Sequence, residues 1–275
     1  MERSAGDIIR YWRKKRSLSQ MALADKLDIS FRHMNYVEND KTRGSRDLLL
    51  RMGRELELTY RARNALLAAS GYSPEYKELD LSADEAAQAR RILEFALQAA
   101  EPYPANIIDA HLNIVMRNKA MDFVIEHFAG DPVALLEKPL TMPRLNFHPD
   151  GLIASMRNPE EAFGMQLGRV HRYLESSEFE YQSLQMIKEL EALRPDVLST
   201  TSAGREAENE RPHLLIPIQL QRGGVCLNII TVVATLGWSQ DITLEELHIE
   251  YGFPADDESN AFLQEAQSNG WSLPN

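Results

Sequence analysis

The chain has 275 residues, of which 44% are hydrophobic and 26% charged, a composition typical of a globular protein. This length predicts two domains rather than one. The single cysteine, Cys226, excludes an internal disulfide framework, and the polar start from Met1 to Asp7 argues against a signal peptide or a membrane anchor. We therefore expect a cytoplasmic protein that does not enter the membrane.

The formal net charge of −11 is unevenly distributed along the chain. Residues 1–76 contain 15 Lys and Arg against 10 Asp and Glu, whereas residues 77–275 contain 15 against 31. Phosphate groups attract a basic surface and repel an acidic one. The split indicates a first domain that faces DNA and an acidic second domain that stays away from it.

The first seventy residues have the pattern of five short helices. The predicted helices cover Asp7 to Arg16, Gln20 to Leu27, Ser30 to Glu38, Leu48 to Leu56 and Ala62 to Ser70. Ser19 and Ser30 can cap the second and third helices, and Gly71 can end the fifth. Only two residues, Asp28 and Ile29, separate the second helix from the third, which is the spacing of a helix-turn-helix motif.

Residues 6–58 resemble the XRE/Cro-type family of helix-turn-helix domains, which have a lambda-repressor-like fold. The likeness lies in Leu18-Ser19-Gln20, Ala24, Ile29-Ser30 and Met34-x-x-Val37-Glu38-Asn39. Two positions depart from the family pattern, since Asp28 and Asp40 stand where the family often has glycine. Asp tolerates the left-handed backbone region better than most residues, so we expect positive φ at both.

The resemblance implies two sets of DNA contacts. One set would hold the phosphate backbone: Gln20, Ser30, Asn39, Lys41 and Arg43. The other would face the base edges in the major groove: Phe31, Arg32, Asn35 and Tyr36. Arg32 is the first candidate for sequence readout, because arginine pairs bidentately with guanine. The alternative is that these are solvated residues of a helical module that binds protein.

The predicted boundary between the domains lies in a polar stretch from Glu75 to Asp84. We expect a DNA-binding domain over 1–76, a linker with a helix over 77–100 and a second domain over 101–275. The apolar stripe of the linker helix is predicted to contain Ile92, Leu93, Ala96 and Leu97.

The second domain has the pattern of an antiparallel sheet with flanking helices, so the whole chain is predicted to be α+β. The expected strands cover 105–110, 112–116, 214–220, 225–236 and 247–254, with a turn at Arg222-Gly223-Gly224 and a capping box from Thr243 to Glu246. Helices are expected over 118–127 and near 160–176 and 179–193. A proline-containing stretch from Pro132 to Pro149 is expected to be irregular, with Gly151 at positive φ after His148-Pro149-Asp150.

This second domain resembles the PAS-like ligand-binding domain of MmyB-like regulators. The likeness lies in Arg63-Asn64-Ala65-Leu66-Leu67 with Gly71-Tyr72, Glu101-Pro102-Tyr103-Pro104-Ala105, His148-Pro149-Asp150-Gly151 and Ile249-Glu250-x-x-Phe253-Pro254-Ala255-Asp256. The resemblance implies a small apolar ligand, with fatty-acid-like molecules as the candidate class.

A pocket between the sheet and a helix could hold such a ligand. Its wall could be formed by apolar side chains: Ile107, Val115, Phe163, Leu167, Ile216, Ile218, Ile230 and Val232. Arg169, with His171 and Arg172, could meet a carboxylate. The alternative is that the apolar residues are ordinary core and the basic residues a solvated face.

Nothing in the sequence points to catalysis. His111, His127, His148 and His171 have no metal-ligand spacing, although a haem-ligating histidine stays open as an alternative. We find no nucleophile elbow, phosphate loop or metal-binding helix, and we expect no catalytic residues, metal or cofactor.

The sequence therefore predicts a transcription regulator that responds to a ligand and binds a pseudo-palindromic operator as a homodimer. Two rival interpretations are a protein–protein adaptor and a peptide-sensing regulator built from helical repeats. The alternating apolar residues from Leu214 to Tyr251 disfavour the repeats.

Overall fold

The computed structural model describes residues 4–165, 188, 192–193, 216–236 and 241–273. The chain divides into two compact units, Met1–Ala83 with Leu236–Glu245, and Asp84–Thr235 with Glu246–Asn275. Most of the two helices predicted near 160–176 and 179–193 lies outside the described residues. Among the helices that are described, none has the length and hydropathy needed to cross a membrane.

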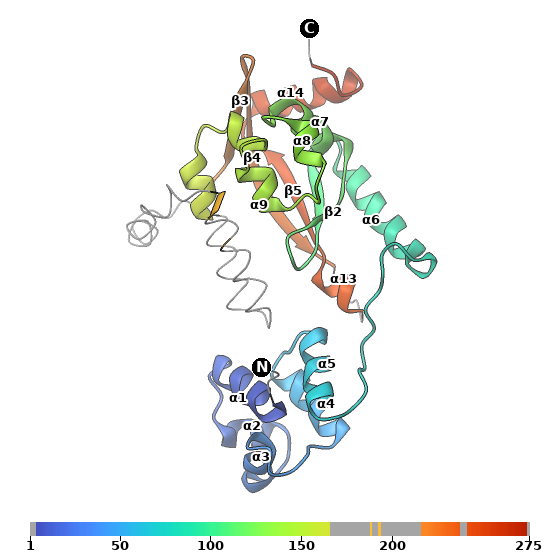
Figure 1. The fold of residues 1–275 in the computed structure, drawn as a ribbon, viewed down its shortest axis with the longest axis vertical. Coiled ribbons are helices and arrows are strands. Elements are labelled where there is room, and N and C mark those ends of the chain that lie inside the picture. The colour runs from blue at the N-terminus through green and yellow to red at the C-terminus, as the bar shows by residue number, and fades with distance from the viewer. Residues whose placement is uncertain (1–3, 166–187, 189–191, 194–215, 237–240, 274–275) are drawn as a thin grey trace. The chain divides into compact units, whose positions relative to one another are not determined.

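The first unit contains the five predicted helices (Figure 1), namely α1 (Ala5–Lys15), α2 (Gln20–Lys26), α3 (Phe31–Glu38), α4 (Arg46–Glu55) and α5 (Tyr60–Ala69). Each helix begins after a Ser or Thr whose hydroxyl accepts a backbone N–H of the first turn: Ser4, Ser19, Ser30, Ser45 and Thr59. Such caps satisfy backbone donors that have no partner within the helix. The caps predicted at Ser19 and Ser30 are confirmed.

Apolar side chains from all five helices form the core of the first unit. Its largest fully buried members include Trp12, Leu23, Met34, Met52 and Leu56. Burying one such side chain stabilises the fold by about 1.5 to 3 kcal/mol. The apolar residues that recur at helical spacing in the sequence thus pack together in one core.

The turns that follow α2 and α3 adopt the left-handed backbone conformation. Asp28 has φ 52° and Asp40 has φ 53°, as expected from their place in the helix-turn-helix pattern. The Asp40 carboxylate also accepts hydrogen bonds from the Gly6 N–H, at 2.9 Å, and from the Ser4 hydroxyl, at 2.6 Å. A Cβ atom at Gly6 would lie 2.3 Å from the Glu38 carbonyl oxygen, so only glycine allows α1 to approach the end of α3.

The first unit also includes a segment from late in the chain that carries α13 (Ile242–Glu246). The Ile242 N–H donates to the Lys77 carbonyl at 2.9 Å, and the Glu245 carboxylate accepts the Tyr60 N–H at 2.7 Å. The predicted cap at Thr243 is wrong. Asp241 precedes the helix and accepts the Leu244 N–H, whereas the Thr243 hydroxyl donates to the Leu79 carbonyl.

The second unit begins with η1 (Asp84–Ala86) and α6 (Ala87–Ala100). Leu93, Leu97 and Ala100 form the buried line of α6, but Ile92 is 55% exposed. The predicted stripe was therefore wrong at Ile92. Residues 93, 97 and 100 follow the spacing of one helix face, whereas residue 92 lies about 100° further around the helix.

A five-stranded antiparallel sheet forms the centre of the second unit (Figure 1), which confirms the predicted α+β class. The strands are β1 (Ala105–Ile108), β2 (Ile114–Arg117), β3 (Ile218–Arg222), β4 (Val225–Thr235) and β5 (His248–Pro254), in the order β2-β1-β5-β4-β3. Gly223 and Gly224 both have positive φ in the β3–β4 turn, which only glycine adopts without strain. β3 starts at Ile218, later than predicted, because the Asn158 side chain binds the Pro217 carbonyl and the Gln219 N–H.

Helices α7 (Lys119–Phe128), α8 (Pro132–Leu136), α9 (Met142–Phe147), η2 (Leu152–Ser155) and α14 (Asp257–Ser268) complete the described part of this unit. The stretch expected to be irregular contains α8 and α9, because Pro132 and Pro143 lie in first turns, where proline is tolerated. The expectation for Gly151 was also wrong. Its φ is −88°, and its lack of a side chain serves a close approach, since a Cβ atom would lie 2.3 Å from the Leu145 carbonyl oxygen.

Candidate functional site

An exposed aromatic and basic surface extends along α3 to the turn that follows it. Phe31 is 50% exposed and Tyr36 is 36% exposed. The Arg32 guanidinium donates to the Tyr36 hydroxyl at 3.1 and 3.2 Å, and the Lys41 ammonium lies 5.8 Å from the centre of the Tyr36 ring. The structure thus brings four of the predicted DNA-contacting residues together. We call Phe31, Arg32, Tyr36 and Lys41 the α3 surface.

Two further predicted residues, Gln20 and Asn35, belong to a hydrogen-bond network that joins α1, α2 and α3. The carboxylate of Glu38 is its centre and is 1% exposed. It accepts two hydrogen bonds of 2.7 Å from the Arg13 guanidinium and one of 2.9 Å from the Gln20 amide. The Asn35 amide donates in turn to the Gln20 side chain at 3.2 Å. The network fixes the direction of Gln20 at the start of α2.

Glu38 stays ionised within this network. Burial alone would raise its pKa, but hydrogen bonds from Arg13 and Gln20, with the positive charges of Arg13 and Arg10, hold the pKa below its usual value. The same hydrogen bond raises the pKa of Arg13. Glu38 and Arg13 were absent from the predicted site, and their only sequence signal was the place of Glu38 in the helix-turn-helix pattern.

The remaining predicted DNA contacts are engaged within the first unit. The Ser30 hydroxyl accepts the His33 N–H, and the Asn39 amide donates to the Asn35 carbonyl at 2.8 Å. Arg43 donates to the Gly71 carbonyl at 2.9 Å, and its guanidinium lies 3.6 Å from the centre of the Tyr72 ring. Ser30, Asn39 and Arg43 are all exposed, and these contacts restrict the positions of their side chains.

The structure distributes the predicted ligand-pocket residues over both faces of the sheet. The register pairs Ile107 with Ile249 and Val232 with Tyr251, so these side chains share one face with Ile230. Ile218, paired with Ile229, lies on the opposite face, in the same core cluster as Phe163. Val115 is 39% exposed, Ile216 precedes β3, and Leu167 and Arg169 lie outside the described residues. The described members of this set therefore do not line one common space.

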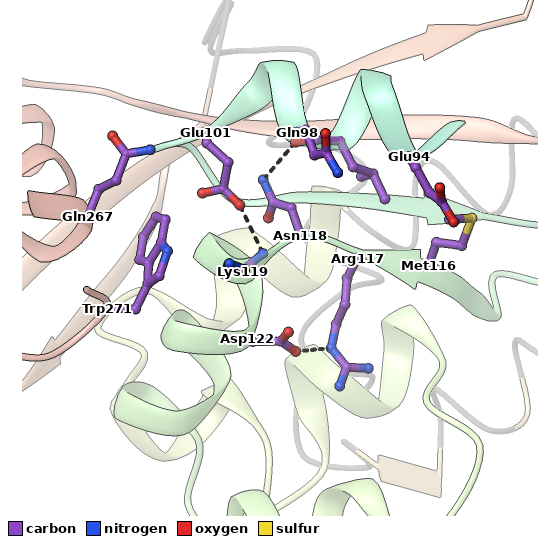
Figure 2. Close-up of a pocket in the computed structure, with 11 residues that line it drawn as sticks. Glu94, Gln98, Glu101, Met116, Arg117, Asn118, Lys119, Asp122, Gln267 and Trp271 are labelled. Carbon is purple, nitrogen blue, oxygen red and sulfur yellow. Dashed lines mark hydrogen bonds and ion pairs between the residues drawn. The ribbon is translucent and has the colours of Figure 1, made fainter. Parts of the chain in front are cut away.

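A cavity of about 410 Å³ lies elsewhere in the second unit (Figure 2). It is lined by residues of α6, β2, α7 and the C-terminal region: Glu94, Leu97, Gln98, Glu101, Met116, Arg117, Asn118, Lys119, Asp122, Gln267 and Trp271. None of the predicted ligand-binding residues is among them. The lining combines acidic and basic side chains with the indole ring of Trp271 and the apolar side chains of Leu97 and Met116.

Glu101 is the most perturbed group of this cavity. One carboxylate oxygen accepts the Lys119 N–H at 2.9 Å (Figure 2), while Oε2 finds no hydrogen-bond partner among the described residues. Burial raises the pKa of Glu101, and backbone hydrogen bonds from Lys119 and Ala120 offset part of this effect. Arg117 and Asp122 form an ion pair at the other side of the cavity. Within the described part of the chain, no group of His, Cys, Asp and Glu side chains could hold a metal ion.

Comparison with known families identifies most of the second unit. Residues 89–266 match the family model described as the MmyB-like transcription regulator ligand binding domain. No curated protein matches the chain.

Proposed function

We propose that the first unit binds specific sequences of duplex DNA and that the second unit binds a small molecule that controls this binding. The chain belongs to the family described as the MmyB-like transcription regulator ligand binding domain. The α3 surface is the observation that carries the proposal. It presents a guanidinium, an ammonium and two aromatic rings at the helix that follows a tight turn. A helix placed in this way is suited to the major groove, where arginine can pair with guanine and an aromatic ring can pack on a thymine methyl group.

The buried network of Glu38 supports this assignment. A helix that reads bases must keep its position when it meets a phosphate backbone, and the bidentate bond from Arg13 ties α3 to α1. The Gln20 amide, held by Glu38 and Asn35, lies at the start of α2, where a backbone N–H and a side-chain amide can meet a phosphate together. The excess of basic residues in 1–76 favours the same partner.

The second unit would act as the sensor, and a small apolar ligand of fatty-acid-like chemistry is the class that the family resemblance implies. Residues 236–245 connect β4 with β5 and belong to the first unit. A ligand that alters these strands would therefore act directly on the segment in which Glu245 holds the start of α5. Affinity for DNA changes only if the ligand binds the two arrangements unequally.

The regulator would bind a pseudo-palindromic operator as a homodimer and carry out no catalysis. Two copies of the first unit would occupy half-sites about 34 to 36 Å apart, or a multiple of that distance.

The test is a binding measurement on DNA selected from genomic fragments by the full-length protein, over a series of salt concentrations. Arg32→Ala should lower affinity about 5- to 150-fold at one base position and relax the preference there, which corresponds to about 1 to 3 kcal/mol. Arg54→Ala, which removes an exposed arginine of α4, is the matched control and should leave base preference unchanged. Binding that shows neither sequence preference nor salt dependence would favour the protein-adaptor interpretation.

A further inference from the structure

Two lines of apolar residues run along α6. The first line, Leu93, Leu97 and Ala100, is buried. The second line consists of Ala89, Ile92, Ala96 and Ala99, with Phe95 beside it. Its two large side chains, Ile92 and Phe95, are 55% and 56% exposed. Residues that recur after three, four and three positions have the spacing of a contact seam between two helices, so this line is suited to a second helix.

The second line points along the face of the sheet rather than over its edge. Ile108 of β1 belongs to the core that contains α7 and α9, whereas Ile107 points to the other face, where it is 0% exposed and α6 contacts β1. Glu94 lines the cavity together with residues of β2 (Figure 2), so its side of α6 points toward the sheet edge at β2. Ile92 lies about 200° from Glu94 around the helix and therefore points toward β5 and β4.

The neighbouring part of the same sheet face is apolar and open. Val232 is 44% exposed and Phe253 is 38% exposed. The register pairs Val232 with Tyr251 and Ile230 with Phe253, so all four side chains share the face of Ile107. The residues of β4 and β5 on this face carry no charge: Cys226, Asn228, Ile230, Val232, Ala234, Ile249, Tyr251 and Phe253. We call the surface formed by Ile92, Phe95, Ile230, Val232, Tyr251 and Phe253 the α6–sheet face.

The α6–sheet face has the size of a substantial part of a protein interface. A buried aromatic side chain removes about 150 to 250 Å² from water, so the exposed parts of Phe95 and Phe253 alone correspond to roughly 140 to 240 Å². A standard interface buries about 800 Å² on each partner, so these two rings supply roughly a fifth to a third of one partner's share. Contiguous apolar patches of a few hundred Å² mark interaction sites.

The charge of the second unit favours a second copy of the chain as the partner. Residues 77–275, which form most of this unit, contain 15 Lys and Arg against 31 Asp and Glu. A basic partner would bind through carboxylates, and none belongs to the α6–sheet face. Two acidic units repel each other, so two copies associate best through a face that buries no charge. The Arg91 guanidinium, 5.5 Å from the centre of the Phe95 ring, lies at the rim, where interfaces are polar.

We propose that the α6–sheet face is the surface through which two copies of the chain form a dimer, with the α6 helices in contact around a two-fold axis. The proposal rests on the homodimer proposed above and names the surface that forms it. A two-fold contact brings the same patch of each copy together, so the patch must fit itself. The small side chains of Ala89, Ala96 and Ala99 leave space beside α6 for the larger side chains of the second copy. The cavity in Figure 2 lies on the other side of α6 and stays free for a ligand.

The experiment measures the mass of the full-length protein by analytical ultracentrifugation over a series of micromolar concentrations. The unaltered protein should be a dimer. Val232 and Val233 are neighbours in β4, are both 44% exposed and point to opposite faces of the sheet, so they form a matched pair. Val232→Glu should weaken the dimer at least about a hundredfold, because a change that costs about tenfold at one site occurs twice in a two-fold contact. Val233→Glu should leave the dimer unchanged.

A second variant tests the helix without adding a charge. Phe95→Ala retains high helix propensity and should weaken the dimer at least about tenfold, whereas Gln98→Ala, on the exposed cavity side of α6, is the control. The urea midpoint of the unaltered protein should rise with protein concentration, and that of Phe95→Ala should rise less. A monomeric unaltered protein, or a dimer that neither Val232→Glu nor Phe95→Ala weakens, would overturn the inference. If Val232→Glu lowers the urea midpoint and leaves the mass unchanged, the chain itself covers this face and the inference also fails.

Binding to DNA separates this inference from the proposed function. The Val232→Glu protein should keep its base preference on a single half-site and lose most of its additional affinity for two half-sites. If the unaltered protein shows no base preference, the proposed DNA-binding role fails, and the mass measurement still decides whether the α6–sheet face forms the dimer.

Discussion

Arg13 and Glu38 form a bidentate pair that joins α1 to α3, with two hydrogen bonds of 2.7 Å and a carboxylate that is 1% exposed. The first prediction concerns this pair. Glu38→Ala should destabilise the first unit by about 3 to 5 kcal/mol, because removing one partner leaves a charge that is largely buried and uncompensated. Glu38→Gln should cost less, since the amide still accepts a hydrogen bond. Urea unfolding measures both, and Glu57→Gln, at a 75% exposed side chain, is the control.

The pH dependence of stability should report the same carboxylate. The pKa of Glu38 is lower in the folded chain than its ordinary value of 4.5. Its contribution is therefore fully present above the pKa of the unfolded chain and is lost as the pH falls through the folded pKa. The urea midpoint should decrease as the pH is lowered below 4.5, and this decrease should be less steep in Glu38→Gln. Parallel curves for the two proteins would show that other groups control the acid transition.

Asp28 and Asp40 share positive φ but differ in what their side chains do, so the same substitution should have opposite effects. Asp28→Gly should stabilise the first unit by up to about 1 kcal/mol, because glycine adopts the left-handed conformation without strain. Asp40→Gly should destabilise by about 1 to 2 kcal/mol, because Gly6 and Ser4 lose the carboxylate that they donate to. Thermal unfolding of the two variants measures both effects, and equal changes in stability would contradict the prediction.

The bond between Glu245 and the Tyr60 N–H joins residues that are 185 positions apart in the sequence. Glu245→Ala should increase hydrogen exchange at the Tyr60 amide and destabilise the first unit by about 1 to 2 kcal/mol, because a first-turn donor loses a charged acceptor. Glu245→Gln retains an acceptor and should restore most of the protection. Unchanged exchange at Tyr60 in Glu245→Ala would mean that the contact contributes little in solution.

Local chemistry made much of the fold predictable. The Ser caps of α2 and α3 and the paired glycines of the β3–β4 turn each depend on a few neighbouring residues, and they are found where the sequence predicts them. The positive φ of Asp28 and Asp40 was expected from the resemblance to the helix-turn-helix family, and it is found as well. The long run from Val225 likewise indicated strand β4, and the alternation of Leu247, Ile249 and Tyr251 indicated strand β5. Such features need no knowledge of what lies across the fold.

The sequence by itself determined the five helices, the five-stranded sheet and the aromatic and basic residues of the α3 surface. Only the tertiary structure decided that the Thr243 hydroxyl binds the Leu79 carbonyl instead of capping α13, that Ile92 is exposed, and that the predicted pocket residues lie on two faces of the sheet. The physical reason is that periodicity shows which side chains share a face, whereas the partner of that face comes from contacts between residues far apart in the chain.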